Sequence, residues 1–400
     1  MKNARAKAFR IYAVPLLLIV AGMTIVPTFL NMFREVPLDF AVFMMSARWL
    51  RQGLDPYHEL LALHAPNANP PAFLIATLPL TLVPDAIAFA LWTAAAIVGL
   101  LFSLDKTARA LKLRFEYLIL VAAGLQGVSA SLRFGQVTLL LLPLFTLAWL
   151  ADRDGRETSA GLWLGAFIYV KPFAGVYALY MLWRREWRTL RSIAAAFIVL
   201  SVAGLLAGPQ ATVSWIETLR AIGEKTSHVV NASWPALIAR VFNVDRSQPA
   251  PAYSPFIVAP ALASVLSLGG EIAIGIVSAW AVARTKDRDL QWAILAAAML
   301  LISPLGWMYY IPLLIPTFAA VIPSRRHLLP VLVAAAILWV PSSVLARNTF
   351  GPFATATYAS PYTWGLLLLW ATLCVDSSIV PTREPSQRST SSNSLLQPTL

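Results

Sequence analysis

Residues 85–104, DAIAFALWTAAAIVGLLFSL, decide the fold class of this chain, because they form a run of twenty residues whose single charge, Asp85, stands at its start. A helix of about 20 apolar residues is long enough to cross the hydrocarbon core of a bilayer. The residues that follow, from Lys106 to Arg114, include four basic side chains, and Lys and Arg concentrate in cytoplasmic loops. The run therefore predicts a membrane span that ends on the cytoplasmic side.

The composition of the whole chain agrees with a membrane protein. Of its 400 residues, 58% are hydrophobic and 12% are charged, and the mean hydropathy is +0.68. A soluble domain carries about 25% charged residues, so this chain lacks the polar surface that water requires. The net charge of +12 comes from short basic clusters between apolar runs, which is typical of cytoplasmic loops and not of a nucleic-acid-binding stripe. The one cysteine, Cys374, excludes an intramolecular disulfide.

The rest of the chain repeats this alternation of apolar runs and basic clusters. With each basic cluster placed in the cytoplasm, it predicts an all-α protein with about twelve membrane helices and with both termini inside. Residues 1–378 are then one transmembrane domain, and the polar residues 379–400 a disordered cytoplasmic tail. The predicted spans are 11–33, 85–104, 192–208, 257–283, 290–306, 308–323, 328–346 and 362–378. The predicted outer loops are 34–84, with an interfacial helix at 71–83, 209–254, with an amphipathic helix at 215–222, and 347–361.

Two intervals, 115–151 and 159–183, are predicted to be hairpins of short helices, since both ends of each interval lie in the cytoplasm. The first hairpin is interrupted at Arg133-Phe134-Gly135-Gln136. The second is broken at Lys171-Pro172, because proline cannot continue the helical hydrogen-bond ladder. Both turns should therefore point towards the outer face, recessed within the bilayer.

Asp39 is the first candidate for chemistry, because it lies just beyond the first apolar run and beside another, Phe40–Met45. A carboxylate in a partly dry cleft can serve as a general base. The alternative is a helix cap, in which Asp39 accepts hydrogen bonds from free backbone amides of a helix that begins at Phe40. Its position in the sequence leaves both interpretations open.

Arg133 and Lys171 are cations at the two hairpin turns. Ionisable groups at membrane depth are costly, about 2.5 to 3.5 kcal/mol on insertion scales, so they usually have partners. Two cations near one face could hold the phosphate of a lipid substrate, although cations at span ends also extend to lipid headgroups. Glu271, midway along the run 257–283, could mark an ion path or pair with a neighbouring helix.

Metal and nucleotide chemistry have little support in the sequence. His58 and His64, with Asp55 and Glu59, match no established zinc spacing, so a solvated interfacial loop is the better interpretation. No glycine-rich phosphate loop is present, and no pattern suggests a Ser-His-Asp arrangement. We therefore expect no cofactor, no metal site and no nucleic-acid partner.

Several short motifs, taken in order, resemble those of glycosyltransferase family 87, formerly the DUF2029 domain. The resemblance covers about residues 36–320. The motifs are Leu38-Asp39-Phe40, Gly53-Leu54-Asp55-Pro56-Tyr57, Asn69-Pro70-Pro71, Gly135-Gln136-Val137, Gly161 to Lys171-Pro172, Asn231-Ala232-Ser233 and Ile302-Ser303-Pro304-Leu305-Gly306-Trp307.

The resemblance implies a GT-C membrane fold with its active site at the extracytoplasmic face and a polyprenyl-phosphate-linked sugar as donor. It implies that Asp39 is the catalytic residue, and it adds support for a phosphate contact at Lys171. One departure is Met308-Tyr309-Tyr310, where many members carry histidines after the tryptophan. The role of those histidines in acceptor handling does not carry over.

The sequence thus predicts an inverting hexosyltransferase, with mannose as a candidate sugar, that acts on a lipid or glycan acceptor outside the plasma membrane. The alternatives are a flippase for lipid-linked sugars, because transporters also contain broken helices and intramembrane carboxylates, and a noncatalytic assembly partner of envelope enzymes. The candidate residues are Asp39 as base, Lys171, Arg133 and Gln136 at the donor phosphate, and Arg48, Asp55, Tyr57, Asn231, Ser233, Trp307, Tyr309 and Tyr310 in the substrate cleft.

Overall fold

The computed structural model describes residues 37–58, 66–222, 227–242, 254–321, 328–346 and 349–379, together with Leu18, Gly22 and Val26. Within these residues every named element is helical, and an isolated β-bridge joins Asn231 and Trp307. The prediction of an all-α protein is therefore confirmed. The predicted first span 11–33, apart from the three single positions, and the predicted tail beyond Ile379 lie outside the described residues.

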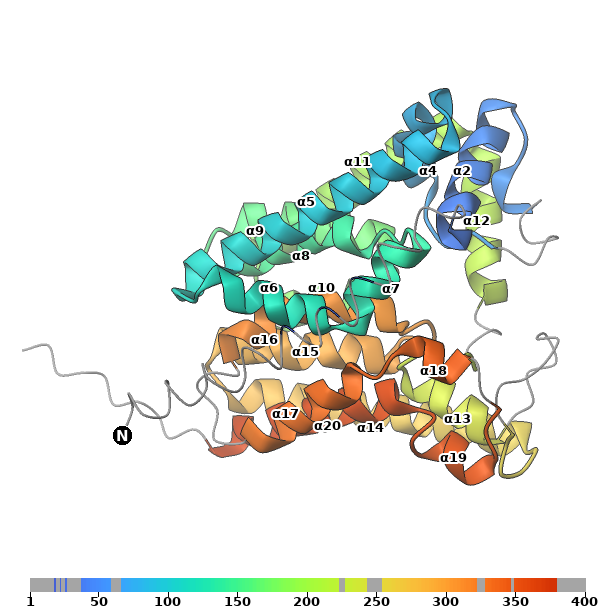
Figure 1. Cartoon of the computed structure of the whole chain (residues 1–400). Helices are drawn as coiled ribbons and strands as arrows, with labels where there is room; N and C mark the ends of the chain where they lie inside the picture. Colours follow the sequence, from blue (N-terminus) through green and yellow to red (C-terminus); the bar gives the residue numbers. More distant parts are fainter. Residues whose placement is uncertain are drawn as a thin grey trace, which may run out of the picture.

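The N-terminal half places four long helices in one slanted layer, with short helices gathered at one end (Figure 1). The long helices of this layer are α5 (Asp85–Leu111), α8 (Thr138–Arg153), α9 (Glu157–Val170) and α11 (Trp187–Gly204). The short elements at its end are α2 (Leu38–Arg51), α4 (Pro71–Thr77), η1 (Leu78–Leu82), η3 (Leu205–Ala207) and α12 (Pro209–Ile222).

The C-terminal half forms the lower layer of Figure 1, and short broken helices lie between the two layers. The lower layer contains α14 (Pro260–Arg284), α15 (Arg288–Ile302), α17 (Leu328–Leu338) and α20 (Pro361–Ile379), with α13 (Trp234–Phe242), α18 (Ser342–Ala346) and α19 (Pro352–Ala356) at one end. The broken helices are α6 (Phe115–Gly124), α7 (Gln126–Phe134), η2 (Pro172–Gly175), α10 (Val176–Trp183), η4 (Met308–Leu314) and α16 (Ile315–Val321).

Among the described residues, three segments are long and apolar enough to cross a membrane: α5, α11 with η3, and α14. The pair α6 and α7, bent by 69°, raises the number to four if it counts as one span. The predicted count of about twelve is not confirmed. Helix α15 is one example, because it has only 15 residues, fewer than the about 20 that a span needs, and its residues from Leu290 to Leu301 are all buried inside the protein. Local hydropathy does not distinguish such a core helix from one that faces lipid.

Prolines account for other differences between the predicted spans and the observed helices. The predicted span 308–323 is a 3₁₀ segment followed by a short α-helix, with Pro312 inside the 3₁₀ segment. The predicted span 328–346 is two helices, α17 and α18, which Pro341 separates. Proline removes a backbone donor and clashes with the preceding turn, so these runs do not continue as straight helices.

Both predicted helix breaks are present. The first hairpin turns between α7 and α8 at Gly135, and it has a further bend at Leu125 that the sequence did not predict. The second hairpin breaks at Lys171, where α9 ends and Pro172 begins η2. The helix predicted at 71–83 is present as α4 and η1, and the helix predicted at 215–222 is longer than predicted, running over the whole of α12. Helices α13 and α19, inside the predicted outer loops, were not predicted.

Close helix packing in the upper layer depends on small residues. A Cβ atom at Gly161 would lie 2.3 Å from the Thr189 carbonyl oxygen, and one at Gly165 would lie 2.6 Å from that of Ile193. These two glycines, four residues apart on α9, let the backbone of α11 approach closely, as in small-residue interfaces of membrane helices. Helix α11 is therefore held by one face, and its other residues are free to face lipid.

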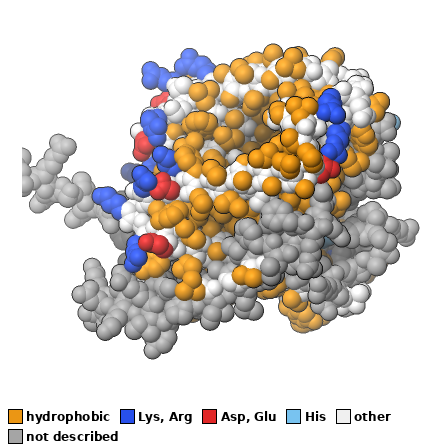
Figure 2. Space-filling view, turned by 45° about the horizontal axis from the view of Figure 1, so that its top comes forward, with side chains coloured by type: hydrophobic (Ala, Val, Ile, Leu, Met, Phe, Trp, Pro, Cys, Tyr) orange, Lys and Arg blue, Asp and Glu red, His pale blue; other side chains and the backbone are white. Residues whose placement is uncertain are grey.

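The surface supports a membrane setting. Figure 2 shows one face on which apolar side chains form a broad field between charged side chains at opposite edges. On α11, Ile198 is 60% exposed and Val199 is 66% exposed. Large exposed apolar fields of this kind are rare on soluble monomers and are expected where the surface meets hydrocarbon.

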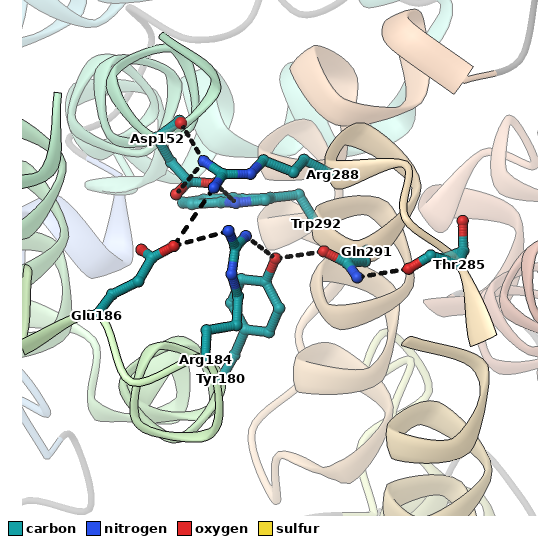
Figure 3. A network of polar contacts seen from close by, with 8 residues as sticks. All are labelled: Asp152, Tyr180, Arg184, Glu186, Thr285, Arg288, Gln291 and Trp292. Atoms are coloured by element: carbon teal, nitrogen blue, oxygen red, sulfur yellow. Dashed lines mark hydrogen bonds and ion pairs between the residues drawn. The ribbon is translucent and has the colours of Figure 1, made fainter. Parts of the chain in front are cut away.

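A network of charged and polar side chains joins the two layers at one end (Figure 3). The Asp152 carboxylate accepts hydrogen bonds from Trp292 Nε1 at 2.7 Å and from Arg288 at 3.4 Å. Arg288 also lies 3.6 Å from Glu186, which pairs with Arg184 at 2.7 Å. Each buried charge therefore has an opposite partner, as buried ions require.

A chain of further hydrogen bonds extends this network. Arg184 donates to the Tyr180 hydroxyl at 2.6 Å, Tyr180 donates to Gln291, and Gln291 donates to the Thr285 carbonyl at 2.7 Å (Figure 3). Asp152 lies in the last turn of α8, a helix of 16 residues. At 1.5 Å per residue, about 24 Å separates this network from the start of α8, where the site described below is located.

Candidate functional site

Asp39 lies in the first turn of α2, and its side chain does not cap the helix. The N-cap residue is Pro37, and no side-chain cap hydrogen bond is present, so the capping alternative is wrong. Instead, Gln136 Nε2 donates to Asp39 Oδ2 at 2.5 Å. The positive end of the α2 dipole also favours a carboxylate in this turn. The half-buried carboxylate is thus held from two sides.

Gln136 reaches Asp39 because α7 ends in a tight left-handed turn. Gly135 has a φ of 68°, its N–H donates to Leu132 O, and the Gln136 N–H donates to Ser131 O at 2.8 Å. This pair of bonds is a Schellman motif, which requires a residue without steric hindrance at the left-handed position. A Cβ at Gly135 would also lie 2.6 Å from Phe40 Cβ, so glycine lets the turn approach α2 closely.

Burial raises the pKa of the Asp39 carboxyl above its ordinary value, because desolvation disfavours the charged form. The hydrogen bond from Gln136 and the positive charge of Lys171 partly oppose this increase. A carboxylate with a raised pKa is a stronger base than an exposed aspartate. The arrangement can therefore accept a proton.

Lys171 is the buried cation of the site, with 6% of its surface exposed. Its Nζ donates to Asn69 Oδ1 at 2.9 Å and lies 5.4 Å from the centre of the Tyr310 ring. It interacts electrostatically with Asp39, yet within the described part of the chain the two form no ion pair within 4.0 Å. A buried ammonium held by a neutral amide keeps its charge available for an anion.

Asn69 is a site residue that the sequence analysis missed. Its side-chain amide donates to Asn67 Oδ1 at 2.9 Å, and Asn67 in turn donates to Ser46 Oγ at 2.8 Å. The Tyr57 hydroxyl donates to the Asn69 carbonyl at 2.8 Å. All four of these side chains are buried, so they form a rigid support for Lys171. The motif Asn69-Pro70-Pro71 could have pointed to Asn69, but the sequence analysis used it only as part of the family resemblance.

Aromatic rings extend from Lys171 along the start of η4. Tyr310 is 5.0 Å from the Tyr309 ring, Tyr309 stacks on Trp307 at 5.8 Å, and Trp307 is 5.7 Å from His228. Tyr309 and Tyr310 both interact electrostatically with Asp39. The structure therefore brings Asp39, Gln136, Lys171, Tyr309 and Tyr310 into one neighbourhood.

Asn231 and Ser233 fix the position of the segment that carries this aromatic row. The Asn231 side chain donates to the Pro304 carbonyl at 2.8 Å and accepts from the Ser233 N–H at 3.1 Å. The backbone of Asn231 bridges that of Trp307, and the Met308 N–H donates to Val230 O at 2.9 Å. Asn231 is fully buried and committed to backbone contacts. These two residues tie together two chain segments about 70 residues apart.

Arg240 fixes the same loop and was not predicted. It is 1% exposed, and its guanidinium donates to the backbone oxygens of His228 and Asn231 at 2.9 and 3.0 Å. It also donates to the hydroxyls of Ser360 and Thr363 at 3.1 and 3.0 Å. A fork of guanidinium donors suits several fixed oxygens at once. Arg240 thus connects α13 to the start of α20 behind the aromatic row.

The model of glycosyltransferase family 87 matches residues 67–304, which is more than half of the chain. This chain belongs to glycosyltransferase family 87. The match includes Asn69, Gln136 and Lys171. The aromatic residues from Trp307 to Tyr310 lie just after its end, and Asp39 lies well before its start.

A curated relative of this family 87 chain is the polyprenol-phosphate-mannose-dependent alpha-(1-2)-phosphatidylinositol mannoside mannosyltransferase of Mycolicibacterium smegmatis. The two are 28% identical over 249 residues, which cover 56% of this chain and 52% of the relative. The chain thus spans about half the length of the relative that it matches. No solved structure matches it.

Two of the remaining predicted residues of the family 87 chain, Arg48 and Asp55, connect helices around the site, and Arg133 does not. Arg48 pairs with Asp85 and so connects α2 to the start of α5. The Asp55 carboxylate accepts from the Tyr57 N–H at 2.9 Å and from the Ser214 hydroxyl, which connects it to α12. Arg133 is exposed, and its guanidinium lies 5.9 Å from the Phe134 ring.

The described part of this family 87 chain contains no group of three or more His, Cys, Asp or Glu side chains placed to hold a metal ion. Two of the four loop residues that the sequence analysis weighed as ligands, Glu59 and His64, lie outside the described residues. The expectation that the chain needs no metal or other cofactor stays a prediction.

Proposed function

We propose that this chain is a membrane glycosyltransferase that moves a sugar from a polyprenyl-phosphate donor to a lipid or glycan acceptor. The observation that carries the proposal is that a held carboxylate, Asp39, lies within electrostatic reach of a buried cation, Lys171, whose hydrogen-bond partner is the neutral amide of Asn69. Family membership and the printed activity of the relative support the same class of reaction.

In the proposed reaction Asp39 is the general base. The acceptor hydroxyl oxygen attacks the anomeric carbon while Asp39 takes the hydroxyl proton, and the bond between that carbon and the phosphate oxygen breaks. The electron pair leaves with the polyprenyl phosphate, and a single displacement inverts the configuration. The raised pKa of Asp39 strengthens it as a base, and Gln136 orients the carboxylate.

Lys171 is proposed to hold the donor phosphate, whose negative charge grows as the bond breaks. A cation that is preorganised in a dry site stabilises this charge without rearrangement during the reaction. Arg133, exposed at the end of α7, is a second cation for the same group. Polyprenyl phosphate is a good leaving group, so the mechanism needs no strong general acid, and we propose that it needs no cofactor or metal.

The sugars are proposed to lie along the aromatic row. Trp307, Tyr309 and Tyr310 offer flat apolar rings with polar edges, which suit amphipathic ligands. Five supporting residues are proposed to shape this cleft by holding the surrounding segments in place, without direct contact with the acceptor. They are Arg48, Asp55, Tyr57, Asn231 and Ser233. Because the relative is a mannosyltransferase that uses polyprenol-phosphate-mannose, mannose is the first donor sugar to test.

The site is proposed to face the extracytoplasmic side of the plasma membrane, with both termini in the cytoplasm. Support comes from the positions of the basic clusters: Arg153 and Arg184 are close to the charged network at one end of α8, whereas Asp39 contacts the other end. Lys and Arg concentrate on the cytoplasmic side. The chain 1–378 is proposed to act as one transmembrane domain.

The test is sugar transfer in membranes that contain the chain, with polyprenyl-phosphate-linked mannose, glucose or arabinose as labelled donor. We expect label in a new glycolipid with the unchanged protein, and none with Asp39→Asn at equal folded amounts. Transfer that persists in Asp39→Asn would exclude Asp39 as base. A labelled lipid that crosses the membrane with its sugar attached would instead identify a flippase, and inactivity with every donor would favour an assembly partner.

A further inference from the structure

An apolar hollow of about 430 Å³ lies where α4, α11 and α12 meet. It is within the size range of pockets that bind small organic ligands, about 300 to 1,000 Å³. Aromatic and aliphatic side chains form most of its lining, among them Tyr169, Phe197, Ile198, Val202, Trp215 and Ile216. Figure 1 shows these helices at the same end of the molecule as α2, which carries Asp39.

The walls of the hollow are held in place by hydrogen bonds and ring contacts. The Tyr169 hydroxyl accepts a hydrogen bond from the backbone N–H of Ala72, and its ring lies 5.3 Å from Phe197 and 6.4 Å from Trp215. Trp215 Nε1 donates to the Ala68 carbonyl at 3.2 Å. These contacts form without a ligand, so the hollow is preformed.

The hollow opens towards the face that is expected to meet lipid. One of its walls is the outer half of α11, which belongs to a candidate membrane span. Ile198 and Val202 on this wall are each 60% exposed, and Leu205 next to them is 51% exposed. A ligand can therefore enter sideways from the bilayer without crossing water.

Two short chain segments separate the hollow from the buried cation. On the first, Tyr169 lines the hollow, and Lys171 lies two residues further along. On the second, Pro71 lines the hollow, and Asn69, two residues before it, binds Lys171 Nζ. An anionic group at Lys171 and an apolar chain in the hollow would thus adjoin the same two segments, 69–71 and 169–171.

We propose that this hollow binds the isoprenoid chain of the donor, with the phosphate at Lys171. The inference rests on the proposed function and adds a location for the part of the donor that does not react. An acyl chain of the acceptor fits the observations less well, because two short segments connect the hollow to Lys171, whereas no residue of the aromatic row from Trp307 to Tyr310 lines it.

The favourable free energy of binding an isoprenoid chain in this hollow comes from the fit between their shapes and not from the hydrophobic effect. Lipid tails are already apolar, so an isoprenoid chain gains little by leaving them for an apolar wall. Contact with the rings of Tyr169, Phe197 and Trp215 instead favours a stiff, methyl-branched chain over a flexible one. The hollow should therefore select the donor lipid, and a change in its shape should alter donor binding alone.

The experiment uses Ser201→Trp, because Ser201 lines the hollow and a large ring there would fill it. The matched control is Val199→Trp, which puts the same ring on the same helix at an exposed position outside the hollow. Donor KM, acceptor KM and kcat are measured in membranes. Binding of labelled polyprenyl phosphate, which lacks the sugar and does not react, is measured with the same variants in detergent.

We expect Ser201→Trp to raise the donor KM about tenfold and to weaken polyprenyl phosphate binding by the same factor, which corresponds to ~1.4 kcal/mol. Acceptor KM should stay unchanged, and Val199→Trp should behave like the unchanged protein. A rise in acceptor KM with no change in donor KM would assign the hollow to the acceptor and overturn the proposal, as would equal binding in both variants.

The two proposals fail in different ways. If no donor supports transfer but Ser201→Trp still weakens polyprenyl phosphate binding, the proposed reaction is wrong and the lipid site stands. If transfer occurs and Ser201→Trp changes neither donor KM nor lipid binding, the reaction stands and the lipid site is wrong.

Discussion

Replacing Asn69 by aspartate changes the charge balance at Lys171 with almost no change in shape. Asn69 Oδ1 accepts from Lys171 Nζ at 2.9 Å, so a carboxylate at this position would form an ion pair with the buried ammonium. If the donor phosphate binds the opposite side of Nζ at a similar distance, the new carboxylate lies about 6 Å from it. The two negative charges then repel by ~2.8 kcal/mol at an effective dielectric constant of about 20.

That repulsion corresponds to about 100-fold weaker donor binding. The fold should survive, because the new ion pair offsets the cost of burying a carboxylate, and the lost hydrogen bond from Asn69 to Asn67 costs only ~1 kcal/mol. The assays are donor KM in membranes and thermal unfolding in detergent.

Asn69→Ala is the control, because it removes the acceptor at Lys171 without adding a negative charge. Loss of a hydrogen bond to a charged group should destabilise this variant by ~1.5 to 3 kcal/mol. Its donor KM should rise less than tenfold, since Lys171 keeps its charge. A donor KM for Asn69→Asp within threefold of the unchanged protein, or equal to that of Asn69→Ala, would refute a phosphate site at Lys171.

Three further predictions concern Asp39, Gly135 and Arg240. Because burial raises the pKa of Asp39, the proposed transfer should decline on acidification at a pH above 3.8, the ordinary pKa of this group. The protonated carboxyl stabilises the fold fully below the unfolded pKa, and this contribution is lost as the pH rises through the raised folded pKa. Asp39→Asn should therefore unfold at a higher temperature than the unchanged protein at pH 8 but not at pH 4. Gly135→Ala should lower the unfolding free energy by at least ~1 to 2 kcal/mol and reduce kcat, because alanine is strained in this left-handed conformation and its Cβ would collide with Phe40. An unfolding free energy and a kcat equal to those of the unchanged protein would contradict the tight turn. Arg240→Met should lose ~3 kcal/mol or more, because four oxygens lose a buried donor, while Arg240→Lys should lose less, which thermal unfolding can compare.

The sequence alone was sufficient for features that depend on neighbouring residues. The run 85–104 predicted a span that the structure contains within α5. Proline chemistry predicted the break at Lys171-Pro172, and short motifs predicted the family. It also selected Asp39 and Lys171 as candidates, because charged residues beside apolar runs are unusual enough to notice.

Only the tertiary structure decided which partners these residues have. Gln136 meets Asp39 across 97 positions, and Asn69 meets Lys171 across 102, and no local pattern encodes such distances. Span counting has a related limit: α15 has only 15 residues, fewer than a membrane crossing needs, and its residues from Leu290 to Leu301 are buried inside the protein. Hydropathy records how strongly a segment avoids water, and only packing determines whether lipid or protein takes the place of that water.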